Sequence, residues 1–312
     1  MDSLALCIPA YNAAAYLPRL LSSARSQHIL FDEVLVYDDC SIDDTAAVAA
    51  QFGARVIQGD TNQGCSYGKN KLAEITTCDW IHFHDADDDL LPNFTTSVHD
   101  WISNSGNAFD VLLLNFNYMD FASGELLGSG NYNIAELHAD PLKYAISNKI
   151  VNFGVYKHSA FIKAGGFDLD ENVLYNEDNA FHQRLAKHHL KFDYLPQITC
   201  INYRYKVSMS ASNRLKCARA NYHVLAKTAS THGDVYPVEL ASRFWECIAV
   251  LASTQDWEYV RKAIKASKKL GYNYSPNEGL LFKNLTKIAP FTAVWLREKN
   301  IRLFKPYLRH EQ

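Results

Sequence analysis

Four aspartates follow directly after a short apolar segment. The segment Trp80–Phe83 leads into Asp85, Asp87, Asp88 and Asp89. An apolar run that ends in carboxylates predicts a buried strand ending at a functional site. Carboxylates this close repel one another, and Mg²⁺ or Mn²⁺ is the hard cation that aspartate oxygens bind. Taken alone, the run is more simply explained as a solvated acidic loop.

Polar residues also follow two earlier apolar segments. Residues 9–12 come after the segment 4–8, and the acidic and hydroxyl-rich residues 38–45 come after the segment 33–37. The segments 55–58 and 80–83 complete four predicted strands, and helical patterns over 16–27, 45–52, 62–77 and 92–102 separate or follow them. Strands that alternate with helices predict an α/β fold with a mostly parallel, Rossmann-like sheet, whose ligands bind at the carboxyl ends of the strands.

The pattern changes after residue 109. Longer, aromatic-rich strands are predicted over 110–119, 151–156 and 192–205, and the pattern is helical from residue 215 onward. A further helix begins at Glu177, and acidic residues in its first turn, Glu177 and Asp178, also suit the helix dipole. The pattern therefore divides the chain into residues 1–109, residues 110–205 and a helical carboxyl-terminal extension over 206–312.

The composition is that of a soluble globular protein. Of the 312 residues 48% are hydrophobic and 21% charged, with a net charge of −3. No apolar run approaches the roughly 20 residues that span a bilayer. The seven cysteines are scattered without a Cys-x-x-Cys pair, which favours reduced thiols. These features predict a cytoplasmic protein.

Five motifs in this order resemble those of the inverting family-2 glycosyltransferases of the GT-A fold. They are Ile8-Pro-Ala-Tyr-Asn12, Val36-Tyr-Asp-Asp-Cys-Ser41 with Asp43 and Thr45, Asn62-Gln-Gly64 with Lys69-Asn70, Asp85-Ala-Asp87, and Gly165-Gly-Phe-Asp168 with Glu177-Asp178. The resemblance covers roughly residues 4–205, and it implies that residues 1–109 form the nucleotide-sugar-binding half of the domain and residues 110–205 the acceptor-binding half. It implies a metal-dependent enzyme that transfers a hexose from a nucleotide-diphosphate sugar, expected to be a UDP-sugar, to an acceptor hydroxyl.

The resemblance assigns the donor site. The matching residues are Pro9, Tyr11, Asn12, Asp38, Asp39, Lys69 and Asp85. Tyr11 can stack on the nucleobase, and Asp39 matches the aspartate that accepts a hydrogen bond from the base. The alternative for Asp38 and Asp39 is a helix cap or Asx-turn, and the alternative for Lys69 is a solvated helix lysine.

The resemblance also assigns the cation and the base. Asp87 matches the residue that ligates Mn²⁺ or Mg²⁺, with Asp85 nearer the ribose and the waters of the metal. Asp178 matches the general base, and Glu177 orients the site or binds the acceptor. Many relatives carry a histidine where this chain has Lys206, which leaves a third protein ligand in doubt. His82 and His84 share one face of a strand, where hydrogen bonding or packing is favoured over metal ligation.

Two other functions remain open. A sugar-phosphate nucleotidyltransferase would share the fold type, but it places a glycine-rich loop after the first strand, and residues 10–15 contain no glycine. A catalytically inactive nucleotide-sugar-binding module would not need both Asp87 and Asp178.

The acceptor is expected to be a saccharide or a lipid-linked sugar of surface polysaccharide or glycolipid assembly. Residues 261–312 carry 12 Lys and Arg against 3 acidic residues, a balance of +9. Basic and aromatic residues together suit the inner face of an anionic membrane, so we expect peripheral contact there. A helical subdomain with a solvated basic face is the simpler alternative. Nucleic acid is not an expected partner, and a homodimer is left open.

Overall fold

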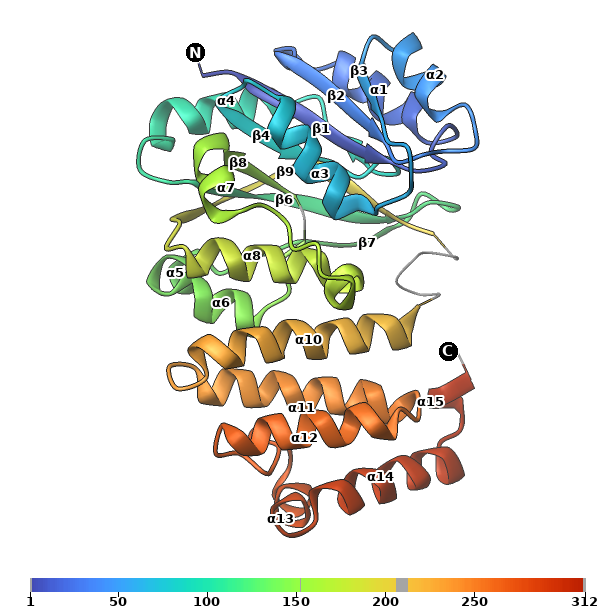
Figure 1. The fold of residues 1–312 in the computed structure, drawn as a ribbon, viewed down its shortest axis with the longest axis vertical. Helices are drawn as coiled ribbons and strands as arrows, with labels where there is room; N and C mark the ends of the chain where they lie inside the picture. Colours follow the sequence, from blue (N-terminus) through green and yellow to red (C-terminus); the bar gives the residue numbers. More distant parts are fainter. Residues whose placement is uncertain (1, 152, 206–212, 311–312) are drawn as a thin grey trace. The chain divides into compact units, whose positions relative to one another are not determined.

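The computed structural model describes residues 2–151, 153–205 and 213–310, shown as coloured ribbon in Figure 1. The chain forms two compact units. Unit 1 comprises Met1–Leu142, Ile150–Leu169 and Phe181–Ser208, and unit 2 comprises Lys143–Lys149, Asp170–Ala180 and Met209–Gln312.

Unit 1 is built on a nine-stranded sheet in the order β3-β2-β1-β4-β8-β6-β9-β5, with β7 paired to β6. The strands are β1 Leu4–Ala10, β2 Glu33–Asp38, β3 Arg55–Gln58, β4 Trp80–Phe83, β5 Asp89–Leu90, β6 Val111–Asp120, β7 Leu126–Ser129, β8 Gly154–Lys157 and β9 Phe192–Arg204. All residues of β1 and β4 are buried, as expected for central strands.

The first four strands pair in parallel, as the alternating pattern predicts. Beyond them the sheet is mixed: β8 is antiparallel to β4 and β6, β9 is parallel to β6, and β5 and β7 are antiparallel to their partners. The α/β fold is confirmed. Its second half departs from parallel pairing because β8 enters the sheet in the opposite direction between β4 and β6.

Helices cover the sheet of unit 1. They include α1 Leu17–Arg25, α2 Thr45–Gln51, α3 Cys65–Ile75, α4 Phe94–Ser105, α5 Ile134–Ala139 and α7 His158–Ala164. Helix α3 packs on β1 and β2, α4 on β9 and α7 on β8 (Figure 1). The four helices predicted in this region lie within about three residues of α1 to α4, but the short strands β5 and β7 carry no clear periodic pattern and were not predicted.

Unit 2 is helical, as predicted for the carboxyl-terminal region. Its elements include η1 Glu171–Asn176, α10 Arg214–His232, α11 Pro237–Ser253, α12 Trp257–Lys269, α13 Leu280–Ile288, α14 Pro290–Phe304 and α15 Tyr307–His310. The predicted core residues Val224, Phe244, Ile248 and Leu251 are buried, whereas Trp257 is only half-buried. Helices α6 Pro141–Ser147 and α8 Glu177–Lys187 cross the boundaries between the units in the sequence.

Candidate active site

Two of the four clustered aspartates hold the loop in place. The buried carboxylate of Asp88 accepts hydrogen bonds from Nδ2 of Asn202 at 2.7 Å and from the backbone N–H of Tyr203 at 2.8 Å. Asp89 pairs with Nε of Arg19 at 2.8 Å and accepts a hydrogen bond from the hydroxyl of Tyr203 at 3.0 Å. These contacts attach the loop after β4 to β9 and α1. They do not involve the carboxylates of Asp85 and Asp87, which can therefore bind a ligand.

The backbone of Asp87 is held separately. Nη2 of Arg19 and the hydroxyl of Tyr205 both donate to the carbonyl oxygen of Asp87, the latter at 3.0 Å. The guanidinium carbon of Arg19 lies 4.2 Å from the ring centroid of Tyr203 and 5.1 Å from that of Phe121. Arg19 therefore joins three aromatic rings to the acidic loop.

Asp85 and Asp87 fit a hard divalent cation. The side chain of Asp85 is 48% exposed, so it is accessible to a ligand. Burial and, second, the nearby charge of Asp85 raise the pKa of Asp87. A raised pKa means that the negative charge at Asp87 lacks sufficient compensation within the protein. The accessible carboxylate of Asp85 and the poorly compensated charge of Asp87 together suit Mg²⁺ or Mn²⁺, which bind oxygen ligands.

Lys69 lies beside Asp85 and is buried. Its Nζ is 3.3 Å from Oδ1 of Asp85 and 5.1 Å from the ring centroid of Phe167, and its side chain is 1% exposed. This burial excludes the interpretation of Lys69 as a solvated helix lysine. It also places the positive charge of Lys69 beside the acidic loop.

The loop after β1 is tied to the loop after β2. Asn12 adopts a positive φ of 49°, its Oδ1 accepts from the N–H of Ile42 at 3.0 Å, and its own N–H donates to Oγ of Ser41 at 2.9 Å. Tyr11 projects from this loop and is 51% exposed, which leaves its ring available for stacking. Pro9 precedes it, fully inside the sheet at the end of β1.

Asp38 and Asp39 are buried and both accept backbone hydrogen bonds. Oδ1 of Asp38 accepts from the N–H of Ser41 at 3.1 Å, a short-range contact of the Asx type. The two oxygens of Asp39 accept from the N–H groups of Gln63 at 2.8 Å and Gly64 at 2.7 Å, at the start of α3. Gly64 has φ 87°, a conformation that favours glycine. Because a carboxylate oxygen has two lone pairs, each retains capacity for a ligand.

A neutral histidine pair lies behind the acidic loop. Nδ1 of His82 donates to the carbonyl oxygen of Gly154 at 2.8 Å, so its Nε2 accepts from Nδ1 of His84 at 2.9 Å. Burial lowers the pKa of His82 to about 4 and that of His84 well below its ordinary value. One donor atom each from His82, His84 and Cys200 lie within 4.8 Å of one another. A metal bound there would have to displace the hydrogen bond between the rings.

Glu177 and Asp178 lie in unit 2, in the first turn of α8. Their predicted roles in catalysis remain predictions. Lys206, at the position where many relatives carry a histidine, lies outside the described residues. The residues that the sequence reasoning missed are Arg19, Asn202, Tyr203 and Tyr205, because nothing in the local pattern links an arginine on a helix to a loop 68 residues away.

Residues 5–163 match the profile of the family described as "Glycosyl transferase family 2". An uncharacterized glycosyltransferase of Haemophilus influenzae is 29% identical over 182 residues, which cover 56% of this chain. This chain spans 60% of the length of that relative.

Solved structures share the fold at low sequence identity. The structure of Staphylococcus aureus TarS 1–349 in complex with UDP-GlcNAc superposes with a TM-score of 0.71 at 15% identity, covering 96% of this chain and 92% of that one. The mannosyltransferase PcManGT of Pyrobaculum calidifontis, in complex with GDP-Man and Mn²⁺, gives 0.58 at 15% identity, covering 98% and 82%. The predicted GT-A fold is thereby confirmed. Among the described residues no helix is both long and apolar enough to span a bilayer.

Proposed function

Because the chain belongs to glycosyl transferase family 2 and is a glycosyltransferase, we propose that it transfers a hexose from a UDP-sugar to an acceptor hydroxyl with inversion, in a cation-dependent reaction. The observation that carries the proposal is that the four aspartates of the acidic loop have different surroundings. Asp88 and Asp89 bond side chains of β9 and α1. Among the described residues, by contrast, Asp85 is 48% exposed with Lys69 as its ion-pair partner, and the carboxylate of Asp87 forms no bond to another side chain.

We assign the donor site to the loops after β1 and β2 in residues 1–109. The exposed ring of Tyr11 stacks on the uracil, and Asp39 accepts a hydrogen bond from the base through its remaining lone pairs. Pro9, Asn12 and Asp38 shape these loops around the nucleoside. Asp85 accepts a hydrogen bond from the ribose, and Lys69 supplies positive charge near the diphosphate.

Asp87 and Asp85 would hold Mn²⁺ or Mg²⁺. When bound, the cation neutralises the charge that develops on the leaving diphosphate. The protein's own part is to keep Asp87 in place, through the bonds that Arg19 and Tyr205 donate to its carbonyl oxygen.

Asp178 is assigned as the general base. It takes the proton of the acceptor hydroxyl as the acceptor oxygen forms its bond to the anomeric carbon, while the bond from that carbon to the diphosphate oxygen breaks and UDP leaves. Attack opposite the leaving group inverts the anomeric centre. Glu177 orients the acceptor.

A panel of nucleotide sugars tests the proposal, with slow hydrolysis as the readout because it needs no knowledge of the acceptor. We expect hydrolysis of one UDP-sugar that chelation abolishes and Mn²⁺ restores. Thermal-shift titration of UDP with and without Mn²⁺ accompanies it. UDP binding without turnover of any sugar would indicate a binding module, and hydrolysis that resists chelation would refute the cation assignment.

We further propose a saccharide or lipid-linked acceptor of surface polysaccharide or glycolipid assembly, bound by residues 110–205. The chain would act in the cytoplasm and contact the inner face of the membrane through the basic carboxyl-terminal residues 261–312. A homodimer is a separate proposal, tested by light scattering on the purified chain.

A further inference from the structure

Helix α13 turns its apolar side chains outward. Leu280, Leu281 and Ile288 are 76%, 78% and 86% exposed, and Thr286 is the buried residue of the helix. Residues 281 and 288 are two turns apart and share one face. A helix normally buries its apolar stripe. In the described part of the chain, nothing covers this one.

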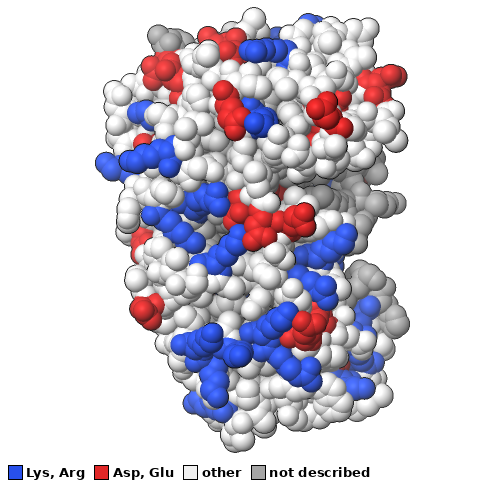
Figure 2. Space-filling view, viewed as in Figure 1, with Lys and Arg blue, Asp and Glu red and all other residues white. Residues whose placement is uncertain are grey.

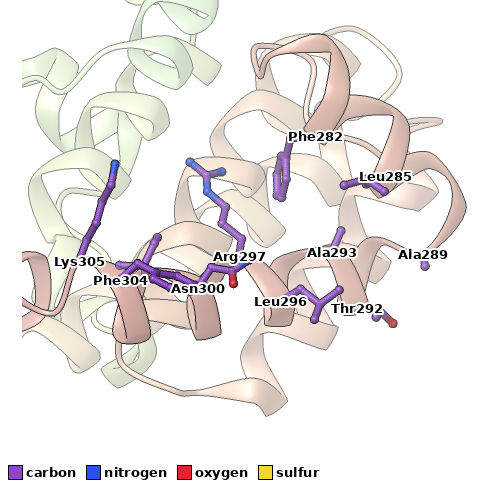
Figure 3. A pocket seen from close by; sticks show the side chains of 11 residues that line it. Phe282, Leu285, Ala289, Thr292, Ala293, Leu296, Arg297, Asn300, Phe304 and Lys305 are labelled. Atoms are coloured by element: carbon purple, nitrogen blue, oxygen red, sulfur yellow. The ribbon is translucent and has the colours of Figure 1, made fainter.

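The neighbouring helix α14 extends the apolar surface, and together with α13 it lines a pocket. Leu303 and Phe304 of α14 are more than 70% exposed. The pocket, of about 580 Å³, is lined by α13 and α14, with Phe282 and Leu285 facing Ala293 and Leu296 (Figure 3). This volume is within the range of small-molecule sites. The polar groups of the lining come from Thr292, Arg297, Asn300 and Lys305.

Basic side chains lie on the same helices as this apolar surface. Figure 2 shows Lys and Arg side chains gathered over the carboxyl-terminal helices on the face drawn. The acidic groups nearby are already used: Glu298 pairs with Arg302 and Arg309, and Glu278 with Arg297. The remaining basic residues of α13, α14 and the turn after them form no ion pair among the described residues. They are Lys283 and Lys287, which lie over the ring of Tyr274, Lys299, which lies over that of Trp295, and Lys305.

We propose that the α13–α14 surface, defined by Leu280, Leu281, Ile288, Leu303, Phe304 and the pocket, docks on an anionic phospholipid bilayer. The exposed leucines, isoleucine and phenylalanine enter the boundary between headgroups and acyl chains. The lysines that form no ion pair contact lipid phosphates, and the pocket takes part of an acyl chain. This rests on and deepens the membrane contact proposed above. A second copy of the chain is the weaker occupant, since its like-charged surround would face this one.

Vesicle co-sedimentation of the full chain tests the inference, without donor or acceptor. We expect binding to phosphatidylglycerol-containing vesicles at least roughly tenfold tighter than to phosphatidylcholine alone, and weaker at high salt. The double variant Leu281→Glu, Ile288→Glu should lose roughly tenfold or more of this affinity, because two charges would have to enter the apolar layer. Both residues are highly exposed, so the fold should survive, which thermal unfolding checks.

The matched control is Val235→Glu, at a residue 64% exposed in the turn between α10 and α11, and it should bind as the wild type. Contact of α14 with acyl chains is followed by the fluorescence of Trp295, a partly exposed residue of this helix, which brominated acyl chains should quench, with Trp295→Phe to subtract the other tryptophans.

Three results would overturn the inference. They are equal vesicle binding by the wild type and the double variant, the same response of Trp295 to inorganic phosphate alone, and a wild-type dimer that the double variant converts to monomer. Hydrolysis of nucleotide sugar in solution is measured on the same samples. It distinguishes failure of the membrane inference from failure of the proposed transfer reaction. The double variant should hydrolyse at the wild-type rate, since neither residue belongs to the donor site.

Discussion

Replacing Arg19 with methionine keeps much of the side chain's length but removes the donors that hold the acidic loop. Arg19 bonds the carboxylate of Asp89 and the carbonyl oxygen of Asp87. Partners that orient the ligands of a metal typically contribute roughly 10 to 100-fold in metal affinity or activity. We therefore expect the Mn²⁺ concentration for half-maximal activity to rise about 10 to 100-fold, equivalent to about 1.4–2.7 kcal/mol.

The stability change should be smaller than the sum of the lost bonds. Hydrogen bonds to charged groups contribute about 1.5–3 kcal/mol when buried, but the side chain of Arg19 is 30% exposed, and solvent reduces that contribution. The assay is a Mn²⁺ titration of nucleotide-sugar hydrolysis, with calorimetric titration of Mn²⁺ in the presence of UDP as a readout independent of turnover. Activity at saturating Mn²⁺ should stay within a few-fold of the wild type.

Arg25→Met is the matched control, because Arg25 is on the same helix and its guanidinium lies over the ring of Phe52, 5.5 Å from the centroid, in a contact that does not involve the acidic loop. Tyr205→Phe removes one donor to Asp87 and should give a smaller shift than Arg19→Met. If Arg19→Met lowers the melting temperature but leaves the Mn²⁺ titration unchanged, Arg19 only supports the fold and the reasoning fails.

The other predictions concern the acids and the buried imidazoles. Asp87→Asn should cost several kcal/mol of transition-state stabilisation with little change in melting temperature, whereas Asp88→Asn should mainly lower the melting temperature; a reversed pattern would exchange their roles. Asp178→Asn should slow transfer by roughly 10² to 10⁴ and keep UDP affinity, with Glu177→Gln as the control, and loss of UDP binding would contradict the assignment. Because His82 has a pKa of about 4 when folded against 6.5 as its ordinary value, only the unfolded chain binds that proton between these values, and stability falls as pH decreases through this window. Urea unfolding should show a slope of up to about 1.4 kcal/mol per pH unit from this group, which His82→Gln should remove.

Much of unit 1 could be predicted because its features are local. Apolar runs that end at polar clusters gave the positions of β1, β2 and β4, and parallel pairing follows from the helices between them. Asp85 and Asp87 were identified by type and spacing. Local patterns do not show what Asp88 and Asp89 bind, because their partners lie on β9 and α1.

The same limit applies in unit 2. A helix ordinarily buries its apolar residues, but the fold buries Thr286 of α13 and leaves the leucines exposed. Which side of a helix is covered depends on the helices that pack against it, and this depends on the whole unit. Lys69 is a similar case, because its burial follows from the position of Asp85 and the ring of Phe167.

The attachment of the acidic loop to β9 also determines when the loop can take its final form during synthesis. Asp88 and its partner Asn202 are 114 residues apart in the chain. At roughly 5–20 residues per second, a ribosome needs about 6–23 s to add that length. Throughout this interval the nascent chain carries the acidic residues without the strand that holds them. The loop that carries the proposed cation site can therefore be completed only after β9 has been made, late in the synthesis of unit 1.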